Sequence, residues 1–244
     1  MISKTMSRIR SGAVAALVAG AAAVSVAPAV AGEMEVNASA AVANMYLWRG
    51  LDLGDGSAAV SGDLVVSKAG AYAGIWVSSG DDALGNEYDY FVGYGGEAGD
   101  FSYDLSLWNY NYSDNGLAGA GFDMSDDTTG ELSEVILTLG YGGVSFSYYD
   151  NIAGGSGYTY MTLSGGIGKF SATVGHHDFD LPGGSTGNDD MTHLDISYAF
   201  NDNLSFTASK IVAQDCDKDD VGCGGTFDED VKFVVAYSLP IEVM

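Results

Sequence analysis

The chain alternates apolar and polar residues in segments of about ten, and these segments are joined by connections of two very different lengths. Three of the joins are tiny and rich in Gly or Asn, at 69–70, 142–143 and 201–203. Other joins are long, acidic and Gly-rich, as over 112–130 and 213–229. Short turns at one end of a sheet and long loops at the other are typical of closed barrels in outer membranes. We therefore expect an all-β fold, a closed antiparallel up-and-down transmembrane β-barrel.

About twelve segments have the length and composition of membrane strands. Tyr, Phe, Val, Thr and Leu, which strands favour, dominate them. The expected strands are 35–46, 57–68, 71–79, 86–95, 100–111, 131–141, 144–150, 157–165, 169–178, 191–200, 203–212 and 230–239. Most are about 9–11 residues long, as a strand tilted across a bilayer requires. Five short periplasmic turns would then face six long, acidic extracellular loops.

The alternation also predicts which side chains face lipid. Over 101–107 and 194–200, apolar residues take every second position, with Ser or Asp at most positions between them. This arrangement reconciles a hydrophobic content of 47% with the absence, after residue 31, of any run long enough for a membrane helix. The 15 Tyr fit the aromatic girdles of such a barrel. A soluble β-sandwich or lipocalin-like barrel would also alternate, but it would bury its apolar face.

The first 31 residues have the pattern of a secretory signal peptide. Lys4, Arg8 and Arg10 form a basic start, 12–26 is a run of small apolar residues, and 29–31 reads Ala-Val-Ala. Such a segment is cleaved after the small residues during export. We therefore expect a signal peptide over 1–31 and a single barrel domain over 32–244.

The chain is strongly acidic, with nine Lys and Arg against 33 Asp and Glu and a net charge of −24. A nucleic-acid partner is excluded, because phosphate binding requires the opposite sign. The acidic loops suit a saline habitat and loose binding of divalent cations. The stretch that opens at Asp215 resembles a Ca²⁺ loop, but Asp220 and Thr226 replace its required Gly and Glu. In an exported protein, Cys216 and Cys223 of this loop are expected to form a disulfide.

Charged residues at inward positions are candidates to line a pore. These are Arg49, Asp63, Glu87, Asp89, Asp104, Glu134, Asp195 and Lys232. Six acids against two bases would favour cations. Twelve strands leave a narrow lumen, so two states are open: a polar channel, or a barrel plugged by charges that pair across strands.

Arg49 stands where the first expected strand meets its loop. It could reach into the pore mouth and hold acidic loops there. The alternative, which we favour, is a structural ion pair with Asp52, Asp55 or Asp63.

Two inward histidines require a check for metal binding and catalysis. His177 and His193 lie near Asp195 by this register, and two His with a carboxylate can bind Zn²⁺ or Cu²⁺. The intervening loop over 179–190 leaves their pairing open, and we expect no resident metal or cofactor. A Ser-His hydrolase is the other reading, but no Ser stands in a nucleophile context. We expect no enzyme activity.

The segment after the signal peptide resembles a known family. Tyr46, Arg49 and Gly50 form a Tyr-x-x-Arg-Gly motif, and 72–76 reads Tyr-Ala-Gly-Ile-Trp. With the hairpin over 86–112, these features are similar to the TorF family of porins from proteobacterial outer membranes. The resemblance implies an outer-membrane barrel with a pore function and no catalytic motif.

Together these patterns predict an outer-membrane porin-like channel for passive diffusion of small solutes, with a preference for cations. It would be monomeric, with outer-membrane lipid and small ions or solutes as its partners. The alternative is a non-conducting structural or adhesive barrel whose surface loops carry the function.

Overall fold

The computed structural model describes residues 34–113, 132–154, 157–179, 190–215 and 227–241. The expected signal peptide over 1–31 and both cysteines, Cys216 and Cys223, lie outside these residues. Within them, no helix has the length and apolar character needed to cross a membrane.

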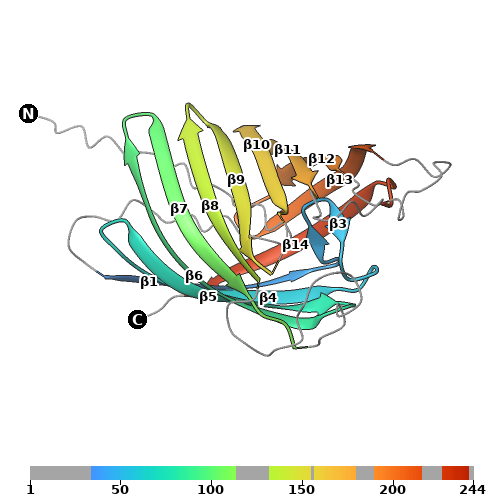
Figure 1. Ribbon diagram of the computed structural model, residues 1–244, viewed down its shortest axis with the longest axis horizontal. Coiled ribbons are helices and arrows are strands. Elements are labelled where there is room, and N and C mark those ends of the chain that lie inside the picture. The colour runs from blue at the N-terminus through green and yellow to red at the C-terminus, as the bar shows by residue number, and fades with distance from the viewer. Residues whose placement is uncertain (1–33, 114–131, 155–156, 180–189, 216–226, 242–244) are drawn as a thin grey trace, which may run out of the picture.

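Twelve antiparallel strands form one closed barrel. They are β1 (Glu35–Ala43), β4 (Ala59–Lys68), β5 (Ala71–Asp81), β6 (Gly85–Ala98), β7 (Phe101–Tyr110), β8 (Leu132–Tyr141), β9 (Val144–Ala153), β10 (Thr159–Ile167), β11 (Phe170–Asp178), β12 (Met191–Ala199), β13 (Leu204–Gln214) and β14 (Lys232–Ile241). Each pairs with its neighbour in sequence, and β1 closes the ring by pairing with both β4 and β14 (Figure 1). The expected fold class and all twelve strands are confirmed, with bounds that differ by a few residues.

The outer wall is an apolar belt. On β6, β7 and β12 the expected outward residues are exposed, Val92 and Leu105 both by 53% and Ile196 by 50%. Among the described strands, the outward carboxylates Asp150 and Asp178 lie close to the loop ends of β9 and β11. Lys210 on β13 is exposed on the same face, but most of the rest of the outer wall is apolar. An apolar wall of this extent requires an apolar surrounding, because its exposure to water is unfavourable. It is the surface that a transmembrane barrel presents to lipid.

The two ends of the barrel differ, as the lengths of the connections predict. The turns at 69–70, 99–100, 142–143, 168–169 and 200–203 lie at one end, with the start of β1 and the end of β14. We call this the turn end and the opposite one the loop end. Two connections at the loop end are shorter than expected, 82–84 between β5 and β6 and 154–158 between β9 and β10. Four long connections therefore remain where we expected six.

Aromatic rings fill part of the interior beside β4 to β8. Phe91 and Trp108 stack with ring centroids 4.2 Å apart. Gly74 faces the ring of Phe91 from the adjacent strand, and a Cβ there would lie 2.5 Å from Cζ. Glycine is thus needed for the ring to lie flat against the wall. The aromatic-girdle interpretation of the tyrosines is therefore only partly right. Five of them, Tyr46, Tyr72, Tyr110, Tyr158 and Tyr160, are buried.

Hydroxyl groups line the interior wall in the turn half of the barrel. Three pairs meet across neighbouring strands: Thr138 with Ser147 at 2.9 Å, Ser164 with Thr173 at 2.8 Å, and Ser197 with Thr207 at 2.8 Å. Each pair consists of direct cross-strand partners. Small polar side chains occupy less of the lumen than aromatic rings do, so the wall beside these pairs is filled differently from the wall beside Phe91 and Trp108.

The first connection at the loop end folds into the barrel. It carries two short strands, β2 (Leu47–Trp48) and β3 (Leu51–Asp52), which pair with each other and with no wall strand. Figure 1 shows them, in blue, between the strands β10–β13 and β4–β6. We call residues 47–52 the inner hairpin. The expectation that the first strand continues to Tyr46 is wrong, because the strand ends at Ala43 and Asn44 makes the last backbone hydrogen bond to β14.

Candidate functional site

The inner hairpin turns on Arg49 and Gly50. Both have positive φ, 47° and 86°, and they are the only residues between β2 and β3. This is the geometry of a two-residue type I′ turn, whose twist matches that of paired strands. Glycine adopts it freely, whereas arginine in the left-handed region is strained. The contacts at the tip must therefore hold Arg49 in place.

Arg49 forms an ion pair with the opposite wall. Its Nη1 and Nη2 donate to Oε1 and Oε2 of Glu134 on β8, at 3.0 and 2.6 Å. Both side chains are almost wholly buried, with 2% and 5% exposed. The expected pair with Asp52, Asp55 or Asp63 is wrong, because the hairpin carries Arg49 across the lumen. Asp52 instead accepts the N–H groups of residues 54 and 56.

Four aromatic rings surround the guanidinium of Arg49. Its Cζ lies 4.5 Å from the ring centroid of Tyr149, 4.6 Å from Trp48, 4.7 Å from Tyr160 and 5.6 Å from Tyr158. A cation over ring faces is attracted by their quadrupoles, most strongly where water is excluded. We call these four rings the cage. Three of them belong to the wall or its connection before β10, and Trp48 belongs to the hairpin.

A circle of hydrogen bonds begins and ends on Arg49. Nη1 donates to the Tyr158 hydroxyl at 2.9 Å, and that hydroxyl donates to Nδ1 of His177 at 2.9 Å. Nε2 of His177 donates to the carbonyl oxygen of Arg49 at 2.8 Å. This order requires a neutral His177 that carries its proton on Nε2. Burial raises the pKa of Tyr158, so its hydroxyl keeps the proton that it donates.

Gly50 packs against the second histidine. A Cβ at Gly50 would lie 2.6 Å from Cγ of His193, so only glycine fits there. His193 bonds through Nε2 to the Tyr160 hydroxyl at 2.7 Å and through Nδ1 to Asp195 at 3.1 Å. The expected inward, adjacent placement of the two histidines matches these contacts, with ring centroids 5.9 Å apart.

Their four ring nitrogens therefore each have a partner within the protein. No cluster of three or more metal-binding side chains occurs among the described residues.

Two carboxylates face the inner hairpin from β6. Glu87 accepts hydrogen bonds from the hydroxyls of Tyr46 and Tyr112, the second at 2.9 Å. Asp89 is 2% exposed, and its Oδ1 has no hydrogen-bond partner among the described residues. Neither forms an ion pair in this part of the chain. The interior thus holds more buried carboxylates than bases.

The remaining predicted pore residues lie apart from this centre. Asp63 accepts from the Ser39 hydroxyl, and Asp104 accepts from the Tyr72 hydroxyl at 2.8 and 2.9 Å. Lys232, at the loop end of β14, donates to the carbonyl oxygen of residue 228 at 2.7 Å. Of the eight charged residues, the structure brings only Arg49 and Glu134 into direct contact.

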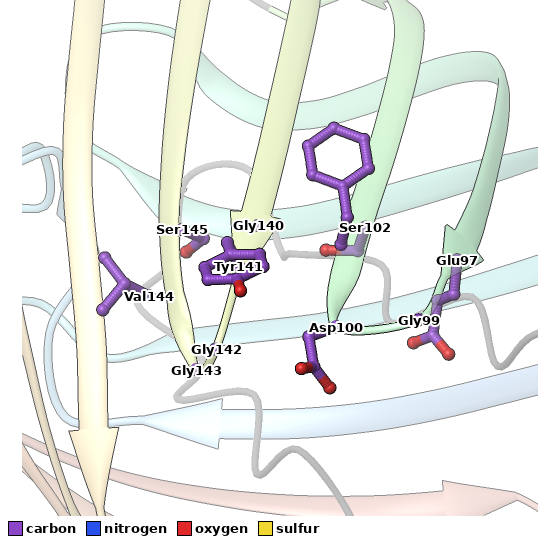
Figure 2. A pocket seen from close by; sticks show the side chains of 11 residues that line it. Glu97, Gly99, Asp100, Ser102, Gly140, Tyr141, Gly142, Gly143, Val144 and Ser145 are labelled. Carbon is purple, nitrogen blue, oxygen red and sulfur yellow. The ribbon is translucent and has the colours of Figure 1, made fainter.

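A hollow of about 630 Å³ lies at the turn end, beside the β6–β7 and β8–β9 turns (Figure 2). Glycines and serines form much of its lining, together with the acidic side chains Glu97 and Asp100. Ser102 and Ser145 reach it from β7 and β9. This part of the rim is therefore not filled by side chains.

Sequence reasoning missed the rings that hold Arg49. It assigned tyrosines to the lipid interface because strand-end position does not tell which face a ring occupies when a loop folds inward. One signal for the inner hairpin was present in the sequence. Arg49-Gly50 lies between two Leu-containing dipeptides, and Gly at the second central position is typical of two-residue hairpin turns.

The structure defines a class: a closed twelve-stranded transmembrane barrel whose lumen contains a hairpin from its own first loop. The chain matches over residues 27–235 the model of a family described as bacterial protein of unknown function (Gcw_chp), and it belongs to that family. That description assigns no activity, and the match does not test the resemblance to the TorF porins, which stays a prediction.

No curated protein matches the chain. Among solved structures, the barrel is similar to OccAB4 of Acinetobacter baumannii, with 12% identity and a TM-score of 0.39. The alignment covers 76% of this chain and 54% of that one, so the chain spans about half the length of OccAB4. At this identity and TM-score, the likeness carries no inference about function.

Proposed function

We propose that the protein is a monomeric outer-membrane channel for passive diffusion of small solutes, with a preference for cations and a closed resting state. The observation that carries the proposal is that a piece of a loop, the inner hairpin, lies inside the barrel with Leu47 and Arg49 buried. The wall strands pair only with each other, so the inner hairpin can leave the lumen without breaking any backbone hydrogen bond between wall strands.

The composition of the interior supports passage of polar solutes. The turn half has hydroxyl pairs along its wall. Rings of polar and charged side chains set the selectivity of such pores. Glu87 and Asp89 are buried acids without an ion-pair partner in the described chain, and they would attract cations to the lumen once the hairpin opens it.

The test is conductance across a planar bilayer. Tyr46 and Leu53 are already joined by a backbone hydrogen bond of 2.9 Å, so residues 47–52 can be replaced by Asn-Gly, a two-residue type I′ turn. We expect rare openings from the native protein and sustained current from this variant, with K⁺ passing more readily than Cl⁻. A folded variant without current would contradict the proposal, and a reversal potential near zero in a salt gradient would contradict the cation preference.

A second candidate is a non-conducting structural barrel whose loops carry the function. It is favoured by the close packing of the hairpin, since Leu47 is fully buried and Tyr46 is 1% exposed. In that case, the native protein and the shortened variant would both be silent in the bilayer.

The proposal includes the location and partners. The apolar belt would face outer-membrane lipid, the acidic loops would bind divalent cations loosely, and no catalysis takes place. Neither a cofactor nor a resident metal is part of the mechanism.

A further inference from the structure

We infer that the wall of the barrel contains a binding site for guanidinium-bearing solutes, which Arg49 fills in the closed state. The wall supplies Glu134 from β8, Tyr149 from β9 and Tyr160 from β10, with Tyr158 just before β10. The inference deepens the proposed function in one respect, because a solute reaches this site when the inner hairpin leaves it.

The geometry selects a guanidinium over other cations. Two parallel N–H groups of Arg49 meet the two oxygens of Glu134 at 3.0 and 2.6 Å. Only a planar fork can make this bidentate contact, whereas an ammonium acts as a point charge. The rings of Tyr149 and Tyr160, with centroids 4.5 and 4.7 Å from Cζ, add faces on which a flat cation can lie.

The charge of the wall favours a cation as its occupant. The ion-pair partner of Glu134 is carried by the hairpin. When the hairpin withdraws, the Glu134 carboxylate loses that partner and faces the opened lumen as an unpaired negative charge. Tyr110 donates to Oε2 at 2.8 Å and keeps this carboxylate oriented. A cation from solution can then replace the guanidinium that has gone.

Arg49 itself fits this site imperfectly. Its Nε is buried and has no hydrogen-bond partner among the described residues. Its backbone lies in the left-handed region, with φ 47°. The unpaired Nε and the positive φ both arise because the guanidinium is attached to the tip of a tight turn. A solute that is free to rotate meets neither constraint, so it can compete with the tethered group.

Binding of methylguanidinium to Arg49→Ala protein in detergent micelles tests the inference without any current. This variant removes the tethered guanidinium and keeps the wall. We expect the melting temperature to rise with methylguanidinium concentration, and methylammonium to bind about tenfold more weakly because it lacks the fork. Native protein, whose site is filled, should show a much smaller shift. The double variant Arg49→Ala/Glu134→Gln should show none.

Equal shifts with methylguanidinium and methylammonium, or a shift that survives Glu134→Gln, would overturn the inference. If Arg49→Ala does not fold, Arg49→Gln keeps a long side chain at the tip without the charge and serves instead, with the same expected preference and the same overturning result. Because binding is measured at equilibrium in micelles, a silent bilayer would refute the channel and leave the site standing. Binding without selectivity would refute the guanidinium site and leave the channel proposal standing.

Discussion

Glu134→Gln tests most directly how the inner hairpin is held. The substitution keeps the shape of the side chain and one oxygen, but it removes the negative charge opposite Arg49. Breaking a buried ion pair costs about 3–5 kcal/mol, because one charge stays buried and unpaired. We take the lower end, about 3 kcal/mol, since the amide oxygen can still accept one hydrogen bond from Arg49 or Tyr110.

This loss falls on the closed state, in which the pair exists. Each 1.4 kcal/mol is a factor of about ten in an equilibrium constant, so the ratio of closed to open channels should fall by roughly 100-fold. Single-channel recording in a planar bilayer measures this ratio as the open probability.

Glu97→Gln is the matched control, because it removes one carboxylate at the turn end, far from the hairpin. An unchanged open probability in folded Glu134→Gln protein would refute the reasoning, and so would an equal rise in Glu97→Gln.

Three further predictions follow from the packing. Gly50→Ala forces a Cβ against His193 at positive φ, and it should weaken the seating of the hairpin by about 2 kcal/mol, measured as a rise in open probability. Phe91→Ala removes a ring stacked on Trp108 and should lower the free energy of unfolding by about 3–5 kcal/mol in urea titrations from vesicles. Val92→Arg, on the lipid face of β6, should lower the same free energy by about 2–4 kcal/mol, while a negligible loss would contradict the lipid-facing assignment.

The strands and turns of the barrel wall could be predicted from the sequence, because each depends on residues that are neighbours in the chain. A strand between lipid and lumen must alternate, and Phe101 to Leu107 do so clearly enough to give both the strand and its facing. The turns could be predicted equally well. Residues 142 and 143 are consecutive glycines, and both have positive φ in the structure. Strand ends were less certain, as β6 extends to Ala98 beyond the expected Gly95.

The inside of the barrel could not be read in the same way. The partners Arg49 and Glu134 are 85 positions apart in sequence, and Arg49 and His177 are 128 apart. The alternation of the wall strands does not indicate which loop folds inward. The inner hairpin has only two residues in each strand, too few to show an alternating pattern of their own. The acids near Arg49 in sequence were the natural candidates for its partner, and the fold places it beside a distant one instead.

The circle of hydrogen bonds through Tyr158 and His177 determines how many current levels single-channel recordings should show. Each donor in it is matched to one acceptor, and the last acceptor is the main chain of Arg49 itself. Breaking any one bond leaves a buried polar group unpaired, which costs about 1–3 kcal/mol and is not recovered by partial withdrawal. The tip is then seated or released as a whole, and recordings should step between two levels with no graded substates.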